Sequence, residues 1–196
     1  MIFMKKQKLE EINKRILDDY KEKEIVLGDG SHDSTIVLIG EAPGAKEVEA
    51  KKPFVGQAGK HLQEFLEILG LDRNELYITN TVKFRPTKKS SKTGGDINRP
   101  PSKKEIEDFK EYLSDEINTI KPKVIVTLGN IPLKTITKDE NAKIGDFHGK
   151  SSKVMVHDSE YNLFPLYHPA AVIYRRELKE VYHKDLKILK DFLNRA

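Results

Sequence analysis

The sequence predicts a single α/β domain, a three-layer α/β/α sandwich with a central, mainly parallel β-sheet. Short apolar runs alternate with stretches whose apolar residues recur every three or four positions, as when strands alternate with amphipathic helices. Residues 123–129 are almost continuously apolar, which is typical of a strand buried on both faces. A length of 196 residues with 37% hydrophobic residues suits one core, so we expect one domain over residues 1–196.

The first part of the chain predicts a helix followed by a strand, loop and helix unit. Apolar side chains at helical spacing predict an amphipathic helix over residues 8–22. Residues 35–39 form the first strand and lead into a glycine-containing loop. The helical spacing returns in residues 62–69, and Gly70 is the expected stop at the C-terminus of that helix.

The rest of the chain continues the alternation. Residues 76–82 and 123–129 are predicted strands, with a helix over 103–120 between them. Residues 154–156 and 163–167 are shorter strand candidates, and a helix with apolar positions from Leu178 to Leu193 closes the chain. Lysines, glycines and neighbouring prolines predict a long mobile inserted loop at about 87–102.

The composition excludes several kinds of site. Without cysteine the chain has no disulfide, iron–sulfur cluster or zinc–thiolate site. No metal is expected either, because most histidines show no metal-ligand spacing; these are His32, His61, His148, His157 and His183. No apolar stretch approaches 18 residues and the N-terminus does not read as a signal peptide, so we expect a cytoplasmic protein without a membrane partner. The net charge of +4 fits a nucleic-acid partner or simply a solvated lysine-rich surface.

Polar groups follow two of the predicted strands. Residues 40–44, Gly-Glu-Ala-Pro-Gly, place the carboxylate of Glu41 in a tight loop directly after the strand 35–39. Residues 162–167 lead in the same way into His168 and Pro169. Ligands of open α/β sheets bind at the carboxyl ends of the strands, so the sequence predicts that Glu41 and His168 belong to one site.

Further motifs accompany these two. The residues of these motifs and their order along the chain resemble those of the family-four uracil-DNA glycosylases. The resemblance extends from about Val26 to the C-terminal helix. One motif alone is weakly specific, whereas seven in the same order make coincidence improbable. The matching segments are residues 27–30, 40–44, 53–59, 78–86, 98–100, 121–129 and 167–171. The resemblance implies that superfamily's α/β/α sandwich and an enzyme that hydrolyses the bond between uracil and deoxyribose.

The resemblance implies that Asn80 and Phe54 recognise the base. The amide of Asn80 would donate to uracil O4 and accept from N3–H, a pattern that cytosine reverses. Phe54 would stack on the flipped base, which contributes about 1 to 3 kcal/mol without distinguishing one base from another. Taken alone, the simpler interpretations are an asparagine that closes a strand through backbone bonds and a phenylalanine of an ordinary core.

The same resemblance implies that Glu41 and His168 act on the glycosidic bond. Glu41 would either orient a water for attack at C1′ or stabilise the cationic sugar. His168 would donate to uracil O2, a hydrogen bond that strengthens as the leaving base becomes anionic. In isolation, a solvated glutamate and a structural histidine before a proline remain the alternatives.

The loop around Glu41 supplies further substrate-binding candidates. Ala42 stands where the most active uracil glycosylases carry an aspartate, so slower chemistry is expected. Gly40 and Gly44 allow close backbone approach, and their amides are candidates to bind sugar or phosphate. The candidate substrate-binding loop therefore comprises Gly40, Ala42, Pro43 and Gly44.

Two segments are candidates for DNA binding. Val172, Ile173 and Tyr174 are apolar wedge candidates beside Arg175 and Arg176, a composition that suits insertion into the vacated stack with phosphate contacts alongside. The alternative is that these apolar residues begin a helix and face the core. A second basic group is equally compatible with solvated lysines; it comprises Lys83, Arg85, Lys88, Lys89, Lys92 and Arg99.

The chain departs from the resembled family at the iron–sulfur cluster. Typical members carry it on four cysteines, and the two positions that can be located hold Phe84 and Phe109 here. We expect these side chains to fill the volume of the cluster, each contributing roughly 1.5 to 3 kcal/mol if buried. The predicted protein is therefore a member without a cofactor.

Three functions fit these observations to different degrees. The leading hypothesis is a monofunctional uracil-DNA glycosylase. It is expected to be a monomer that uses water as nucleophile on single- or double-stranded uracil-containing DNA. A non-catalytic or weakly active module that binds damaged DNA is the alternative. A nucleotide-handling enzyme ranks last, because residues 40–44 lack both the dinucleotide glycine pattern and a Gly-Lys-Ser ending.

Overall fold

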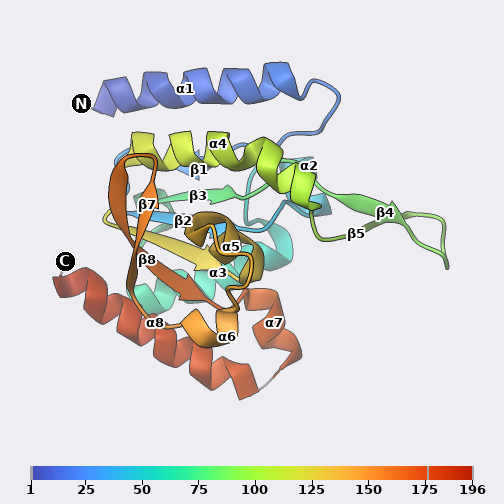
Figure 1. The fold of residues 1–196 in the computed structure, drawn as a ribbon. Coiled ribbons are helices and arrows are strands. Elements are labelled where there is room, and N and C mark those ends of the chain that lie inside the picture. The colour runs from blue at the N-terminus through green and yellow to red at the C-terminus, as the bar shows by residue number, and fades with distance from the viewer. Residues whose placement is uncertain (1, 176, 196) are drawn as a thin grey trace.

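In the computed structural model, which describes residues 2–175 and 177–195, a six-stranded sheet separates two layers of helices (Figure 1). The strand order is β1-β3-β2-β6-β8-β7. These strands are β1 (Asp29–Gly30), β2 (Ile36–Gly40), β3 (Leu76–Asn80), β6 (Val124–Leu128), β7 (Ser152–Val156) and β8 (Ser159–Leu166). The inner strands β3, β2, β6 and β8 run parallel, and β1 and β7 are antiparallel edges. The predicted fold class is confirmed.

Helices cover both faces of this sheet. On one face lie α4 (Lys103–Ile120), α5 (Asn130–Thr137) and α6 (Ile144–Phe147), with α1 (Ile2–Asp19) packed outside α4. On the other face lie α3 (Gly56–Leu69) and α8 (Glu177–Arg195). The short helices α2 (Ala45–Ala50) and α7 (Pro169–Tyr174), and the 3-10 turn Arg73–Glu75, belong to connections. No helix among the described residues combines the length and the apolar character that crossing a bilayer requires.

Strands β2, β3 and β6 are buried along their whole length because each packs against helices on both faces of the sheet. In β2, Val37 and Ile39 pack toward α1 and α4, whereas Ile36 and Leu38 pack toward α3 and α8. All five residues of β2 are buried, and so are all five of β3 and β6. The predicted helix over 103–120 has the same bounds as α4, and Gly70 ends α3 in the left-handed conformation with φ of 71°.

The segment expected to be a long mobile loop is instead a β-hairpin. Strand β4 (Thr87–Lys89) pairs antiparallel with β5 (Asp96–Asn98), and the hairpin projects from the body of the molecule (Figure 1). Ser102 then caps α4: its hydroxyl accepts the Glu105 backbone N–H at 3.2 Å, and the Glu105 carboxylate accepts the Ser102 N–H at 2.7 Å. Composition indicated a loop because glycine and serine gather at the tip, but the flanking residues pair.

Phe84 and Phe109 pack in an aromatic cluster between α1 and α4. The exposed fractions are 7% for Phe84 and 0% for Phe109, and their ring centroids lie 5.8 Å apart. Tyr20, at the end of α1, stacks on Phe109 with centroids 4.4 Å apart. With no cysteine in the chain and these rings packed together, the residues present do not fit an iron–sulfur cluster.

The aromatic cluster should contribute measurably to stability. Replacing Phe109 with leucine is expected to lower the free energy of unfolding by about 1 to 3 kcal/mol, because each lost aromatic pair is worth about 0.5 to 1.5 kcal/mol beyond its buried area. Urea denaturation measures the change, with Leu17→Ala as control, since Leu17 on α1 is 48% exposed. A change in Phe109→Leu no larger than in Leu17→Ala would contradict a structural role for the cluster.

Candidate active site

The four parallel strands end along one edge of the sheet. Gly40 of β2 is the register partner of Asn80 of β3, and Leu128 of β6 is the partner of Leu166 of β8. Because these strands are neighbours, the residues that follow them come together at this edge. The structure thus places the loop that starts at Gly40, Asn80 and the segment leading to His168 along one edge. That Glu41 and His168 act in one site stays a prediction.

Three of the expected substrate-binding residues pack against one another. A Cβ atom on Gly40 would lie 2.3 Å from Oδ1 of Asn80 and 2.9 Å from two ring atoms of Phe54. Any side chain at position 40 would therefore displace both groups. Gly40 is required here by close approach, and it brings Asn80 and Phe54 to the same spot.

The amide of Asn80 is buried with an unsatisfied donor. The residue is 2% exposed, and its Nδ2 has no hydrogen-bond partner among the residues that the structure describes. An unpaired buried donor costs about 1 to 3 kcal/mol, so such a group is rarely retained without a ligand to satisfy it. The Asn80 Nδ2 thus makes no hydrogen bond that would close the strand, and its N–H lies unpaired and buried at the carboxyl end of β3.

Glu47 holds the two loops of the site together and was missed by the sequence analysis. One carboxylate oxygen accepts the Gly44 N–H and the other accepts the Phe54 N–H, each at 2.7 Å. Glu47 is 8% exposed, and burial raises its pKa although these hydrogen bonds and Arg73 oppose the rise. The signal in the sequence is a glutamate three residues after Gly44, the spacing of a helix-capping pair at the start of α2.

Phe54 is fixed from its other side by Arg73. The guanidinium donates to the carbonyl oxygens of Pro53 at 2.6 Å and Phe54 at 3.1 Å. Phe54 has φ of 52°, in the left-handed region that non-glycine residues seldom adopt, and its side chain is 4% exposed. Strained backbone of this kind persists where surrounding contacts enforce it, here those of Glu47 and Arg73. Nothing local in the sequence marked Arg73 for this role.

Glu41 is half-buried at the start of its loop. The loop is attached to the segment after β3, because Thr81 donates its backbone N–H to the Gly40 carbonyl at 2.9 Å and Val82 donates to the Glu41 carbonyl at 3.1 Å. Burial raises the pKa of the Glu41 carboxyl. Pro43 is buried and Ala42 packs against the core on the α4 side, so the polar side chain of the loop is that of Glu41.

His168 begins the short helix α7 and is held by that helix. Its Nδ1 accepts the backbone N–H of Ala170 at 3.1 Å, so in the neutral ring the proton sits on Nε2. Burial lowers the pKa of His168, and the nearby His61 lowers it further. A Cβ on Gly129, directly after β6, would lie 3.2 Å from the His168 Cβ. The imidazole is therefore a neutral Nε2–H donor beside the end of β6.

Residues from both halves of the site surround one narrow gap in the interior. They include Phe54, Pro169 at the start of α7, and His61 and Tyr182 of α3 and α8, and the gap is too small to hold a water molecule. The His61 Nε2 and the Tyr182 hydroxyl are buried without a partner among the described residues. This packing places the Phe54 loop beside the start of α7.

The structure contradicts the expectation that Lys83 contacts DNA. Its side chain is fully buried, and its Nζ lies 2.5 Å from a carboxylate oxygen of Glu116 on α4. It also donates to the Thr79 hydroxyl at 2.6 Å and to the Asn80 carbonyl at 2.8 Å. A lysine with so many interior partners is structural: it attaches the end of β3, and with it Asn80, to α4. Glu116 was not identified from the sequence.

The remaining DNA-binding candidates are placed as follows. Arg85 donates from Nε to Oδ1 of Asn98 at 2.6 Å, at the root of the hairpin. Val172 packs against the core on the α3 and α8 side, which supports the alternative that it begins a helix and faces the interior. Arg175 is exposed. Arg176 and the side chains of Ile173 and Tyr174 lie outside the described part of the chain.

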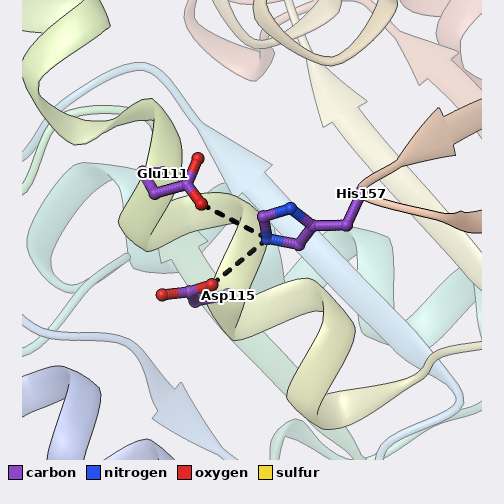
Figure 2. A group of neighbouring side chains, drawn as sticks. All are labelled: Glu111, Asp115 and His157. Carbon is purple, nitrogen blue, oxygen red and sulfur yellow. Dashed lines mark hydrogen bonds and ion pairs between the residues drawn. The ribbon is translucent and has the colours of Figure 1, made fainter.

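One further group of side chains has the composition of a metal site. Figure 2 shows Glu111 and Asp115 of α4 facing His157, which lies in the turn between β7 and β8. The His157 Nε2 lies 3.1 Å from an Asp115 oxygen and 3.8 Å from a Glu111 oxygen, and Arg15 pairs with the other Asp115 oxygen at 3.2 Å. These are contacts of a surface ion-pair group that attaches the turn to α4, and we assign no metal to it.

Comparisons with known proteins identify the family of the chain. The profile described as the uracil DNA glycosylase superfamily matches residues 27–192. Proteins named type-4 uracil-DNA glycosylase are similar to the chain over most of their length. The one from Saccharolobus solfataricus is 38% identical over 88% of this chain and 77% of its own.

Two further relatives carry the same name. The Pyrobaculum aerophilum protein is 37% identical over 92% of this chain and 90% of its own, and the Archaeoglobus fulgidus protein is 39% identical over 83% and 78%. The resemblance noted from the motifs is thereby confirmed. The chain belongs to the uracil DNA glycosylase superfamily.

Proposed function

We infer that this protein is a uracil-DNA glycosylase, which hydrolyses the N-glycosidic bond of uracil in DNA and leaves an abasic site. The observation that supports it most is Asn80, whose buried Nδ2 lacks a partner within the described chain and whose amide lies against Gly40 and Phe54. A uracil placed there would receive that N–H at O4 and return its own N3–H to Oδ1. The type-4 uracil-DNA glycosylases to which the chain is similar act, as their name says, on uracil in DNA.

The proposed mechanism divides the developing charges between two residues. Phe54 stacks on the extruded base, which is read by Asn80. The Nε2–H of His168 donates to uracil O2 and stabilises the negative charge that the leaving base acquires. Glu41 faces the sugar, where its carboxylate stabilises the cationic transition state or orients the attacking water. Residues 40–44 and the Glu47 carboxylate hold these groups in place.

The burial of Lys83 supports hydrolysis rather than lyase chemistry. Lys83 is the lysine closest in sequence to Asn80, and its ammonium is buried among Glu116, Thr79 and the Asn80 carbonyl. A lysine held in this way does not attack a sugar carbon. We propose a monofunctional enzyme that acts as a monomer and uses water as nucleophile, without a cofactor, on single- or double-stranded DNA.

Uracil release from an oligonucleotide tests the proposal. Purified protein is incubated with single- and double-stranded 30-mers that contain one uracil, and alkali then cleaves at abasic sites. We expect scission at the uracil position on at least one substrate. We expect no covalent protein–DNA adduct when borohydride is added to the reaction. DNA binding without scission would favour the non-catalytic module, for which Ala42 beside Glu41 is the supporting residue.

Discrimination between bases tests the role of Asn80. The Asn80→Asp variant loses the N–H donor, so uracil release should slow and the preference for uracil over cytosine should fall at least about ten-fold, since one such hydrogen bond is worth about 1 to 3 kcal/mol. Single-turnover rates on matched uracil and cytosine substrates measure it. Asn141→Asp, at an exposed position, makes the same change away from the site. An unchanged preference in Asn80→Asp would remove Asn80 from base recognition.

A further inference from the structure

The β4–β5 hairpin starts at the candidate active site. It follows β3 and its Asn80 by a short segment, and its returning strand β5 lies close to the loop of residues 40–44. The Asn98 side-chain nitrogen is 3.9 Å from the position that a Cβ of Gly44 would take. From this root the hairpin extends away from the body of the molecule (Figure 1). It therefore lies beside the place where the target nucleotide would enter.

The root of the hairpin is built as a firm attachment. Arg85 donates to the Asn98 side chain at 2.6 Å, and Arg99 donates to the Thr87 carbonyl at 3.0 Å. Arg99 also forms two hydrogen bonds with the Glu105 carboxylate, at 2.6 and 2.7 Å, which lower the pKa of Glu105 to about 2. This bidentate pair therefore stays ionised throughout the neutral pH range. The direction of the hairpin is set by these contacts.

The two faces of the hairpin differ in charge. Lys89 and Asp96 are cross-strand partners and form an ion pair of 3.0 Å. On the opposite face Lys88 is the partner of Ile97, which is 41% exposed. Among the described residues no acidic side chain pairs with Lys88 or with Lys92 at the tip. One face and the tip thus carry positive charge that the protein does not neutralise.

The size and composition of the tip suit a nucleic-acid groove. Its residues are small or hydroxylated apart from Lys92, and all but Ser90 are exposed. The Ser90 hydroxyl accepts the N–H groups of Lys92 and Thr93 and so orders the turn. At about 3.3 Å per residue, the three steps from Thr87 to Ser90 span about 10 Å before the chain turns. This equals about three nucleotide steps along one strand of B-DNA.

We propose that the β4–β5 hairpin is a DNA-binding arm, in which Lys88 and Lys92 bind backbone phosphates several nucleotides from the uracil. This inference rests on the proposed function for the identity of the bound polymer. Phosphate contacts position the protein on DNA and carry no sequence information. The arm would add affinity for long substrates and leave the chemistry at the uracil unchanged.

Salt dependence of binding distinguishes the arm from an ordinary charged surface. The probe is a 30-base-pair duplex with a tetrahydrofuran abasic analogue, titrated with Lys88→Gln/Lys92→Gln protein across a series of salt concentrations. Each lost phosphate contact lowers the slope of log K against log salt by about 0.9, so the double variant should lose about 1.8. Its affinity should fall roughly two- to thirty-fold. Lys8→Gln/Lys14→Gln, at exposed positions of the outer helix α1, is the charge-matched control and should retain the wild-type slope.

Substrate length supplies the second measurement. With subsaturating protein, uracil release by the hairpin variant should be slowed on a 30-mer and should equal wild type on a pentanucleotide with a central uracil. Three results would each contradict the proposal that the hairpin is a DNA-binding arm. The hairpin variant could keep the wild-type slope, or the α1 control could lose as much slope as the hairpin variant. The hairpin variant could also be slowed as much on the pentanucleotide as on the 30-mer. If the wild type releases no uracil at all, the proposed function fails, and the slope on the abasic duplex still decides whether the hairpin binds DNA.

Discussion

Replacing Lys83 with methionine should be among the most destabilising single changes in this protein. The free energy of unfolding is expected to fall by about 3 to 5 kcal/mol, because the substitution leaves the fully buried Glu116 without its counter-charge. Burial lowers the pKa of Lys83, and the Glu116 carboxylate opposes that shift. The charged form of Lys83 therefore depends on the presence of Glu116. Tyr77 and Thr79 also bond to Glu116, and burial with the Glu116 charge raises the Tyr77 pKa well above its usual value.

Thermal and urea denaturation measure this effect. For a chain of this size each kcal/mol corresponds to about 2 to 4 °C in Tm, so Lys83→Met should lower Tm by roughly 10 °C. Adding Glu116→Gln removes the unpaired charge and should recover part of the loss. Lys14→Met, at an exposed position, should change stability by less than about 0.5 kcal/mol. If Lys83→Met were as stable as Lys14→Met, the buried pair would not anchor the end of β3.

Removing the His168 imidazole should have the largest effect on turnover. His168→Ala is expected to lower the single-turnover rate of uracil release about 10²- to 10³-fold, the usual loss when one preorganised donor to a developing anion is removed. Binding to abasic DNA should change little, because abasic DNA lacks the O2 atom to which His168 would donate. His32→Ala serves as control, because the neighbouring Ser31 bonds to Leu76 at the start of β3, at the opposite edge of the sheet from Asn80. A rate within three-fold of wild type would show that His168 does not stabilise the leaving base.

The pH dependence of stability provides an independent check on His168. Its pKa is lowered in the folded protein, so the unfolded chain binds the proton more readily. The neutral ring therefore stabilises the fold fully above the unfolded pKa, near 6.5, and this contribution is lost as the pH falls through 6.5 toward the folded pKa. Urea titrations at pH 7.5 and 5.5 should show a smaller acid destabilisation in His168→Ala than in the wild type. An equal difference would show that the ring is not held in its neutral form.

Local patterns in the sequence were sufficient to predict most helices and strands and to identify the two motifs that contain Glu41 and His168. The strands β2, β3 and β6 are recognisable because strands buried on both faces are apolar at most positions. Parallel strands share one carboxyl edge, so the sequence predicts that Glu41 and His168 belong to one site, and the resemblance adds Asn80. The replacement of two cysteine positions by Phe84 and Phe109 likewise predicted that these side chains pack in the interior, and both are buried in the structure.

Only the tertiary structure decided what each charged side chain does. Lys83 and Lys88 look alike in sequence, but Lys83 meets Glu116 from a helix 33 residues away, whereas Lys88 stands on an exposed strand. Glu47 orders the site by meeting the N–H of Phe54 across a turn, which neither residue signals by itself. Apolar periodicity is a local property of the chain, and the sequence therefore determines it directly. The partner of a charge depends on which distant segments the fold brings together, and that is decided only when the chain has packed.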